Sequence, residues 1–255
     1  MEAPERAPGI PVDYYARIHR FEEDHFWYRG MRKITAALLG EALHRPGSRL
    51  LDAGCGPGGF LRWAVDHGSF ATAAGVDIGA DAIVLARERV PEADLRTGEL
   101  RALPFPDASF DLVVTNDVLQ HVPETDVAES LRELRRLLAP DGTLLVHTNG
   151  SRRLRRERDD WRAYDRATLV RELETAGFRC RRATYANMLL SLWGSLRGRE
   201  PHAPSETQDG IPTAAPSGFV TAVGGAVLAA EARWLAHPGR SLPFGHTLFA
   251  VAEPA

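Results

Sequence analysis

The feature that most limits the fold is an alternation, from Ser48 onward, of short apolar runs with segments of helical length. The apolar runs cover residues 49–53, 72–78, 93–98, 110–116 and 142–149, and the intervening helical patterns cover residues 60–66, 80–90 and 124–140. Strands that alternate with helices of this length predict βαβ units and an α/β fold, with a parallel sheet covered on both faces. The loops after the strands should therefore meet at one edge of the sheet.

The regions on either side of this alternation are less regular. Residues 13–43 have a helical pattern rich in aromatic side chains, and we expect a break near residues 26–30. A helix should follow Asp165 and end at Gly177, because aspartate caps helix starts and glycine follows helix ends. A sixth strand from residue 179, a loop at 197–217, a helix at 219–236 and a closing edge strand at 245–253 complete the chain. We therefore expect an N-terminal helical lid at 1–45 and one domain at 46–255, with an insertion at about 187–240.

Composition excludes several classes of protein. The 255 residues carry 31 basic and 34 acidic side chains, a net charge of -3, so no basic field is available for nucleic acid. Two cysteines are too few for a disulfide framework, and the chain has neither a signal-peptide pattern nor an apolar run of bilayer length. These features predict a cytoplasmic protein without stable membrane insertion. No Cys/His cluster has metal-ligand spacing, so we expect no metal site.

A glycine-rich turn follows the first strand and opens a helix. Its residues Gly54, Gly56 and Gly59 satisfy the G-x-G-x-x-G pattern of dinucleotide-binding proteins, which keeps an NAD-dependent oxidoreductase open. Asp77, at the end of the second strand, can accept hydrogen bonds from ribose hydroxyls in this or another nucleotide site. Asp52 favours a different ligand, because its carboxylate would repel a pyrophosphate and would complement a sulfonium or an amino group.

Further polar residues are expected at the same edge of the sheet. Glu99 follows the third strand, where it can meet an adenine amino group, and Asn116, Asp117 and His121 follow the fourth strand. We expect His121 about one turn into a helix that begins there. Because the ordinary pKa of histidine lies near neutrality, His121 is the candidate general base for a hydroxyl acceptor, with a structural role as the alternative.

Four successive motifs resemble those of the class I S-adenosylmethionine-dependent methyltransferases. They read LLDAGCGPGG, GVDIGADAIVLAR, TGELRALPFPDASFDLVVTNDVLQHV and LRELRRLLAPDGTLLVHTN, and they cover residues 48–150 in order. The segments HFWYRGMRK and LPFGHTLFAVAEP resemble a bacterial subgroup of that family that acts on small molecules. The resemblance implies a Rossmann-like sheet of seven mostly parallel strands with an antiparallel last strand, for which residues 245–252 are suitable.

The resemblance also implies the residues that would hold S-adenosylmethionine and its product S-adenosylhomocysteine. Asp52, Gly54 and Gly56 would line the methionine part, and Asp77 would bind the ribose. The remaining contacts would be Ile78, Glu99 and Leu100 with the adenine, the Asn116 carbonyl with the α-amino group, and Arg29 with the carboxylate. The family more often has Asp where this chain has Glu99, so a longer side chain must be accommodated.

The function implied is methyl transfer to an oxygen, nitrogen or carbon atom of a small molecule, in bacterial secondary metabolism or sugar tailoring. Two alternatives stay open. A family member that binds the cofactor without methylating can act as a cyclase, an isomerase or a partner protein, and the glycine pattern alone also fits the oxidoreductase. The sequence identifies neither the acceptor nor the oligomeric state.

Overall fold

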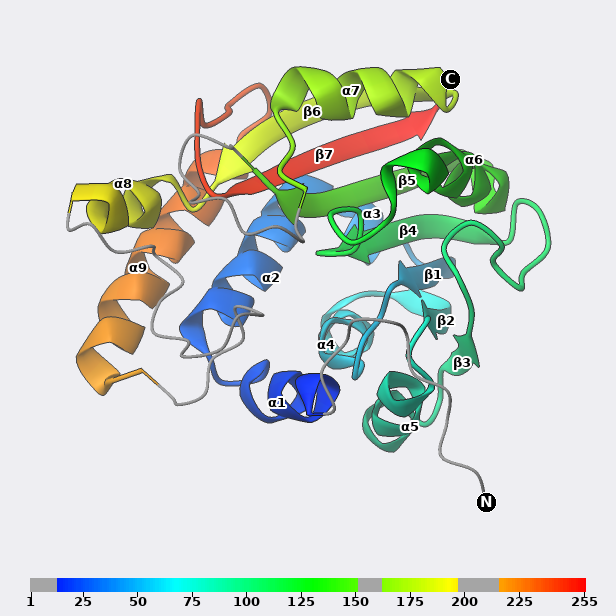
Figure 1. The fold of residues 1–255 in the computed structure, drawn as a ribbon, viewed down its shortest axis with the longest axis horizontal. Helices are drawn as coiled ribbons and strands as arrows, with labels where there is room; N and C mark the ends of the chain where they lie inside the picture. The colour runs from blue at the N-terminus through cyan, green and yellow to red at the C-terminus, as the bar shows by residue number, and fades with distance from the viewer. Residues whose placement is uncertain (1–12, 151–161, 197–215) are drawn as a thin grey trace.

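The computed structural model describes residues 13–150, 162–196 and 216–255, which form one seven-stranded sheet in the order β3-β2-β1-β4-β5-β7-β6 (Figure 1). The strands are β1 (Ser48–Ala53), β2 (Phe70–Asp77), β3 (Asp94–Thr97), β4 (Phe110–Asn116), β5 (Leu138–Asn149), β6 (Phe178–Ala186) and β7 (Thr247–Pro254). β1 to β5 pair in parallel, and β7 runs antiparallel to both β5 and β6. The predicted α/β class, with mostly parallel strands and an antiparallel last strand, is confirmed.

The position of the last strand differs from the expectation. β7 was expected at the edge of the sheet, but it lies between β5 and β6, so β6 is the edge strand. The physical reason is visible in the burial of Leu248, Phe249 and Ala250, which are at most 1% exposed. An apolar strand that is buried on both faces suits the interior of a sheet, whereas the Arg-rich sequence of β6 suits a solvent-exposed edge.

The helices cover both faces of the sheet, as predicted. In Figure 1, α6 and α7 lie on one side, while α2, α4 and α5 lie on the other. The helices of the described residues are α1 (Tyr14–Phe21), α2 (Phe26–Leu39), α3 (Glu41–His44), α4 (Gly59–His67), α5 (Ala80–Arg89), α6 (Val127–Leu137), α7 (Arg166–Thr175), α8 (Met188–Leu196) and α9 (Gly218–Leu235).

Local capping explains where several helices begin and end. Asp165 accepts a hydrogen bond from the Thr168 N–H at 2.8 Å, and Gly177 has a φ of 87° just after α7, so both predicted helix boundaries are confirmed. The predicted break at 26–30 is wrong by a few residues. It falls at 22–25, because the His25 side chain accepts from the Trp27 N–H at 3.3 Å and starts α2 there.

The N-terminal helices pack in two different places. α2 buries Met31 and Ile34 in the main core, and its Phe26 packs against α9 at Gly224. α1 lies beside α5 (Figure 1). The lid at 1–45 and the insertion at 187–240 stay predictions. The expected loop at 197–217 lies almost wholly outside the described residues, as does the start of the N-terminal segment.

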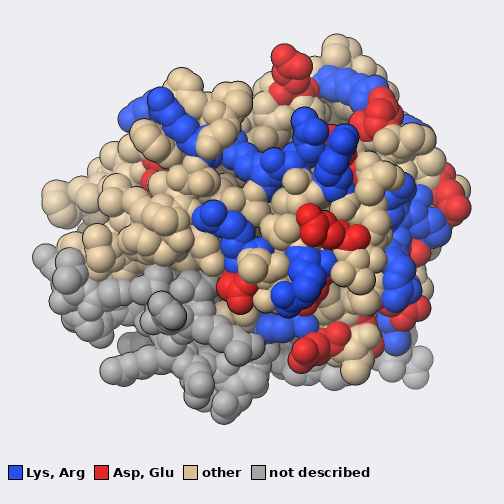
Figure 2. All heavy atoms as spheres, turned by 90° about the horizontal axis from the view of Figure 1, so that it is seen from above, with Lys and Arg blue, Asp and Glu red and all other residues tan. Residues whose placement is uncertain are grey.

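The surface has a charged part and an apolar part. Figure 2 shows basic and acidic side chains interspersed over much of the face near α6 and α7, and few charges toward the side of α8 and α9. α8 and α9 expose large apolar side chains: Leu189, Leu192, Trp193, Phe219, Val220, Val223 and Trp234. In the part of the chain that the structure describes, no helix combines the length and apolar character needed to cross a membrane.

Candidate functional site

The glycine-rich turn between β1 and α4 folds back onto the end of β2. The N–H groups of Gly54 and Cys55 both donate to the Val76 carbonyl oxygen, at 2.7 and 2.9 Å. Gly54 has a φ of 88° and Gly56 a φ of 51°, in the left-handed region that favours glycine. A Cβ atom on Gly54 would also collide with the Val118 side chain. The turn therefore requires glycine at position 54 and contacts the loop that follows β4.

Asp52 lies near the carboxyl end of β1 and is only 1% exposed. Both of its carboxylate oxygens are buried, and neither has a hydrogen-bond partner among the residues that the structure describes. Burial raises the pKa of this carboxyl group well above its usual range, and the charge of Asp77 raises it further. Because a buried polar group without a partner costs free energy, a cationic or hydrogen-bond-donating ligand group would stabilise this position.

Asp77, at the end of β2, accepts three hydrogen bonds. The Tyr15 hydroxyl donates at 2.8 Å, the Gly79 N–H at 2.9 Å and the Gly56 N–H at 2.8 Å. Burial raises the pKa of Asp77, although these hydrogen bonds oppose the change. The next residue, Ile78, is 45% exposed, so its apolar side chain is accessible to a ligand. Tyr15 is the contact that the sequence did not predict.

The segment after β3 joins the same edge of the sheet. The Gly98 N–H donates to the Asp77 carbonyl oxygen at 3.0 Å, so Glu99 and Leu100 follow directly beside β2. The Glu99 side chain is about half exposed and pairs with Arg101, with 2.6 Å between Oε2 and Nε. Leu100 is partly buried against the core. The structure thus brings Asp52, Asp77 and the start of this segment together.

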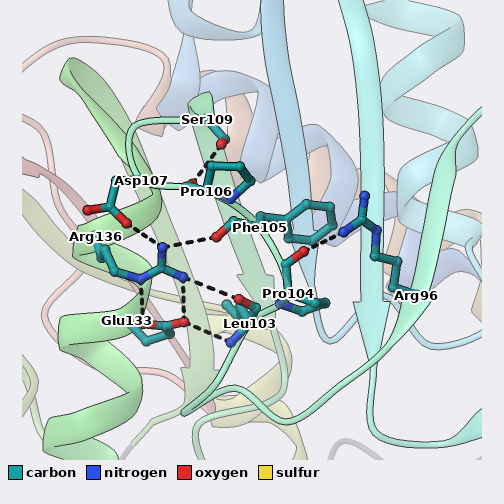
Figure 3. Close-up of polar contacts among 9 residues, drawn as sticks. All are labelled: Arg96, Leu103, Pro104, Phe105, Pro106, Asp107, Ser109, Glu133 and Arg136. Carbon is teal, nitrogen blue, oxygen red and sulfur yellow. Dashed lines mark hydrogen bonds and ion pairs between the residues drawn. The ribbon is translucent and has the colours of Figure 1, made fainter.

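Side chains of α6 hold the loop between β3 and β4 (Figure 3). The Arg136 guanidinium donates to the carbonyl oxygens of Leu103 and Phe105, at 3.2 and 2.9 Å, and to the Asp107 carboxylate at 2.5 Å. Glu133 accepts from the Leu103 N–H at 2.8 Å and pairs with Arg136 at 2.7 Å. The sequence signals this pair only through the three-residue spacing of Glu and Arg on one helix.

A polar cluster joins the ends of β4 and β5. Asp117 has a φ of 56°, an unusual conformation for a residue other than glycine, and its N–H donates to the His147 carbonyl oxygen at 2.9 Å. Its carboxylate accepts from the Gln120 amide at 3.2 Å and lies 3.6 Å from His147 Nδ1. His147 stacks on Phe249, and burial lowers its pKa against the opposing charge of Asp117. Asn116, expected at this site, has a buried Nδ2 without a partner among the described residues.

Two predicted site residues are exposed. His121 lies in the turn between β4 and the 3₁₀ turn Glu124–Asp126, so the expectation that it belongs to a helix is wrong. Pro123 precedes that 3₁₀ turn, and a residue before proline is restricted away from helical geometry, which delays the helix. Arg29 lies on α2 and is also exposed. Their roles as general base and carboxylate ligand stay predictions.

Comparison with known proteins identifies the domain. A family model described as "Methyltransferase domain" matches residues 51–146. A protein named "Probable S-adenosylmethionine-dependent methyltransferase" from Mycolicibacterium smegmatis is 32% identical over 177 residues, which are 67% of this chain and 66% of the relative. A malonyl-[acyl-carrier protein] O-methyltransferase from Enterobacter lignolyticus is 34% identical over 52% of each chain. The chain thus spans just under two thirds of the first relative and about half of the second.

Solved structures share the fold. The [4+2]-cyclase SpnF superposes with a TM-score of 0.62 at 19% identity, covering 91% of this chain and 84% of the cyclase. The superposition shows that the two proteins share a fold. At this level of sequence identity it carries no information about the reaction.

Proposed function

This chain belongs to the class I S-adenosylmethionine-dependent methyltransferases, and we propose that it transfers a methyl group from S-adenosylmethionine to a small-molecule acceptor. The observation that carries the proposal is the pair of buried carboxylates at the ends of β1 and β2. Asp52 has two oxygens without donors among the described residues, and Asp77 is held by two backbone N–H groups beside it. Such a pair suits a ligand that has a cationic part and a diol.

The residues present fit this cofactor. Asp52 would accept from the α-amino group or face the sulfonium, and Asp77 would accept from the ribose hydroxyls. The open geometry of Gly56, where a Cβ atom would have no neighbour within 4 Å, leaves room for a ligand. The full set of proposed cofactor contacts is Arg29, Asp52, Gly54, Gly56, Asp77, Ile78, Glu99, Leu100 and Asn116.

When bound, S-adenosylmethionine supplies an electrophilic methyl group on a sulfonium that leaves as a thioether. The chain's own residues then have to align the acceptor, exclude water and, for a hydroxyl acceptor, remove a proton. His121 is the proposed base because it lies in the turn after β4 and is exposed toward solvent. His147 is less suited, since it is 3% exposed and stacked on Phe249. An amine acceptor that arrives unprotonated would not need His121.

We propose that the acceptor is a small molecule, and we name no particular compound. The malonyl-[acyl-carrier protein] O-methyltransferase relatives make an oxygen acceptor the first class to test. A cytoplasmic location and a place in secondary metabolism or sugar tailoring are part of the same proposal. Both cysteines are free thiols in the structure, in keeping with a reducing compartment.

Isothermal titration with S-adenosylhomocysteine tests the cofactor assignment. The wild-type chain should bind, and Asp77→Ala should lose about tenfold or more in affinity, because a charge-assisted hydrogen bond is removed. Asp141→Ala is the matched control, since Asp141 is an exposed carboxylate near the start of β5, away from the strand ends that form the site. Equal affinity in wild type and Asp77→Ala would overturn the assignment.

The same preparation separates the alternatives. Thermal stabilisation by NAD and not by S-adenosylhomocysteine would indicate an oxidoreductase. Binding of the cofactor product without methyl transfer to any acceptor of a diverse panel would favour a cyclase, an isomerase or a partner protein. Methylated product from S-adenosylmethionine would establish the proposed reaction.

A further inference from the structure

Tyr15 of α1 forms a hydrogen bond with the carboxylate of Asp77, the residue to which the proposed function assigns the cofactor ribose. Its hydroxyl donates to Asp77 Oδ1 at 2.8 Å, and its ring lies directly against Gly79 at the start of α5. Tyr15 is 6% exposed. Burial and the charge of Asp77 raise the pKa of the Tyr15 hydroxyl, so it stays protonated and remains a donor at neutral pH.

The acceptor capacity of Asp77 shows why this contact matters. A carboxylate accepts about four hydrogen bonds, two on each oxygen. The Gly79 N–H uses one position on Oδ1, the Gly56 N–H uses one on Oδ2, and Tyr15 uses the second position on Oδ1. About one position, on Oδ2, is then left. A ribose diol that donates to both oxygens therefore requires the Tyr15 hydroxyl to leave.

A buried ion pair holds α1 in this place. Arg89 of α5 pairs with Glu22, directly after α1, and the two side chains are 8% and 7% exposed. Arg89 also donates to the carbonyl oxygen of His19 in α1, at 2.8 Å, and to that of Pro57 in the glycine-rich turn, at 3.3 Å. The Glu22 carboxylate itself lies against Gly59. One guanidinium thus ties the end of α1 to the turn beside Asp77.

We propose that α1 is an autoinhibitory strap, in which Tyr15 competes with the cofactor ribose for Asp77. The inference rests on the proposed function, because it takes Asp77 as the ribose ligand. The apparent affinity for the cofactor is then reduced by the fraction of molecules in which Tyr15 holds Asp77. Removal of the Tyr15 hydroxyl should strengthen binding, whereas the loss of a residue that contacts the cofactor would weaken it.

The test compares binding of S-adenosylhomocysteine to the full chain and to Tyr15→Phe, which keeps the ring. The variant should bind about tenfold more tightly, the size expected for one hydrogen bond to a charged group. Tyr14→Phe is the matched control on the same helix and should leave the affinity unchanged. Glu22→Gln, which weakens the ion pair with Arg89 and leaves Asp77 unchanged, should also tighten binding of S-adenosylhomocysteine.

Hydrogen exchange gives a second readout that a merely structural role would not move. Addition of S-adenosylhomocysteine should speed exchange of the amides at 15–22 while it protects the turn at 54–59. Protection of residues 15–22 by the ligand, or equal or weaker binding by Tyr15→Phe, would overturn the strap and leave the cofactor assignment standing. If wild type and Tyr15→Phe both fail to bind, the proposed function is overturned together with the strap.

Discussion

Replacing Asp52 with asparagine should make the protein more stable and at the same time weaken its binding of S-adenosylhomocysteine. The side chain is 1% exposed, and its oxygens have no donor among the described residues. Its ionised form also lies in the field of two other carboxyl groups, Asp77 and Glu22, which together with burial raise its pKa. Asparagine has nearly the same shape and removes the charge, so it relieves a cost in the free protein and removes the attraction for a cationic ligand group.

The size of the stability gain follows from the burial. An unsatisfied buried polar group costs about 1–3 kcal/mol, and more when it is charged. A gain of about 2 kcal/mol in the free energy of unfolding would raise Tm by roughly 4–8 °C for a chain of this size. The loss of a charge-assisted contact should weaken binding of S-adenosylhomocysteine by about tenfold or more.

The pH dependence has a defined sign. The folded-state pKa of Asp52 is raised above its unfolded value of about 3.9, so the folded state binds the proton more tightly. Below that unfolded value the carboxyl group is protonated in both states, so the stability difference between wild type and Asp52→Asn should not change with pH there. As the pH rises from there through the raised pKa, the wild type should lose stability relative to the variant, by at most about 1.4 kcal/mol per pH unit.

Thermal melts of wild type, Asp52→Asn and Asp141→Asn, recorded from acidic to neutral pH with and without S-adenosylhomocysteine, test this reasoning. Asp141 forms an exposed ion pair with Arg45, and such pairs contribute little, so its replacement should leave Tm nearly unchanged. A lower Tm for Asp52→Asn than for wild type at neutral pH would refute the reasoning, because it would mean that the Asp52 carboxylate stabilises the free fold. A stability difference that shrinks as the pH rises would do the same.

Two further variants test the contacts of Arg136 with the loop between β3 and β4 and the buried side chain of His147. Arg136→Ala should lower the free energy of unfolding by roughly 1–3 kcal/mol, because the carbonyl oxygens of Leu103 and Phe105 lose their donor. Hydrogen exchange at residues 103–107 should become faster for the same reason. Unchanged exchange there would show that Arg136 does not hold the loop. Burial lowers the pKa of His147, so the wild type should lose stability as the pH falls below about 6.5, and His147→Phe should reduce that loss in thermal melts. The same pH dependence in both proteins would show that His147 does not titrate with folding.

Those parts of the fold that depend on contiguous residues were predictable from the sequence. β4 begins and ends where the apolar run 110–116 does, and the glycine-rich turn adopts the left-handed geometry at Gly54 and Gly56 that its composition indicates. Asp52 and Asp77 could be placed together because parallel strands present their carboxyl ends at one edge. Each of these inferences needs only the period of a short segment and the general rule of parallel sheets.

The two main errors have different causes, one in packing between distant segments and one in a local turn. The pattern of residues 245–253 indicates a strand, but the place of β7 between β5 and β6 depends on which strand edge is left open once the parallel part has formed. His121 is in a turn because Pro123 and the 3₁₀ turn after it delay α6. Strand order is therefore weakly encoded in local sequence, whereas the delayed start of α6 follows from a nearby proline that the sequence shows.

The contacts that control the site are of the same long-range kind. Tyr15 and Asp77 are 62 positions apart, and Glu22 and Arg89 are 67 apart, so no window of sequence shows that an aromatic hydroxyl will meet the Asp77 carboxylate. A tyrosine in a helix rich in aromatic residues is expected to pack against the core, and the ring of Tyr15 does pack, against Gly79. Only its hydroxyl enters the proposed competition for Asp77. The residues that bind a cofactor in this fold lie at the ends of adjacent strands, so their motifs recur in a recognisable order along the sequence. A segment such as α1 that covers those strand ends can come from any part of the chain, so no such order reveals it.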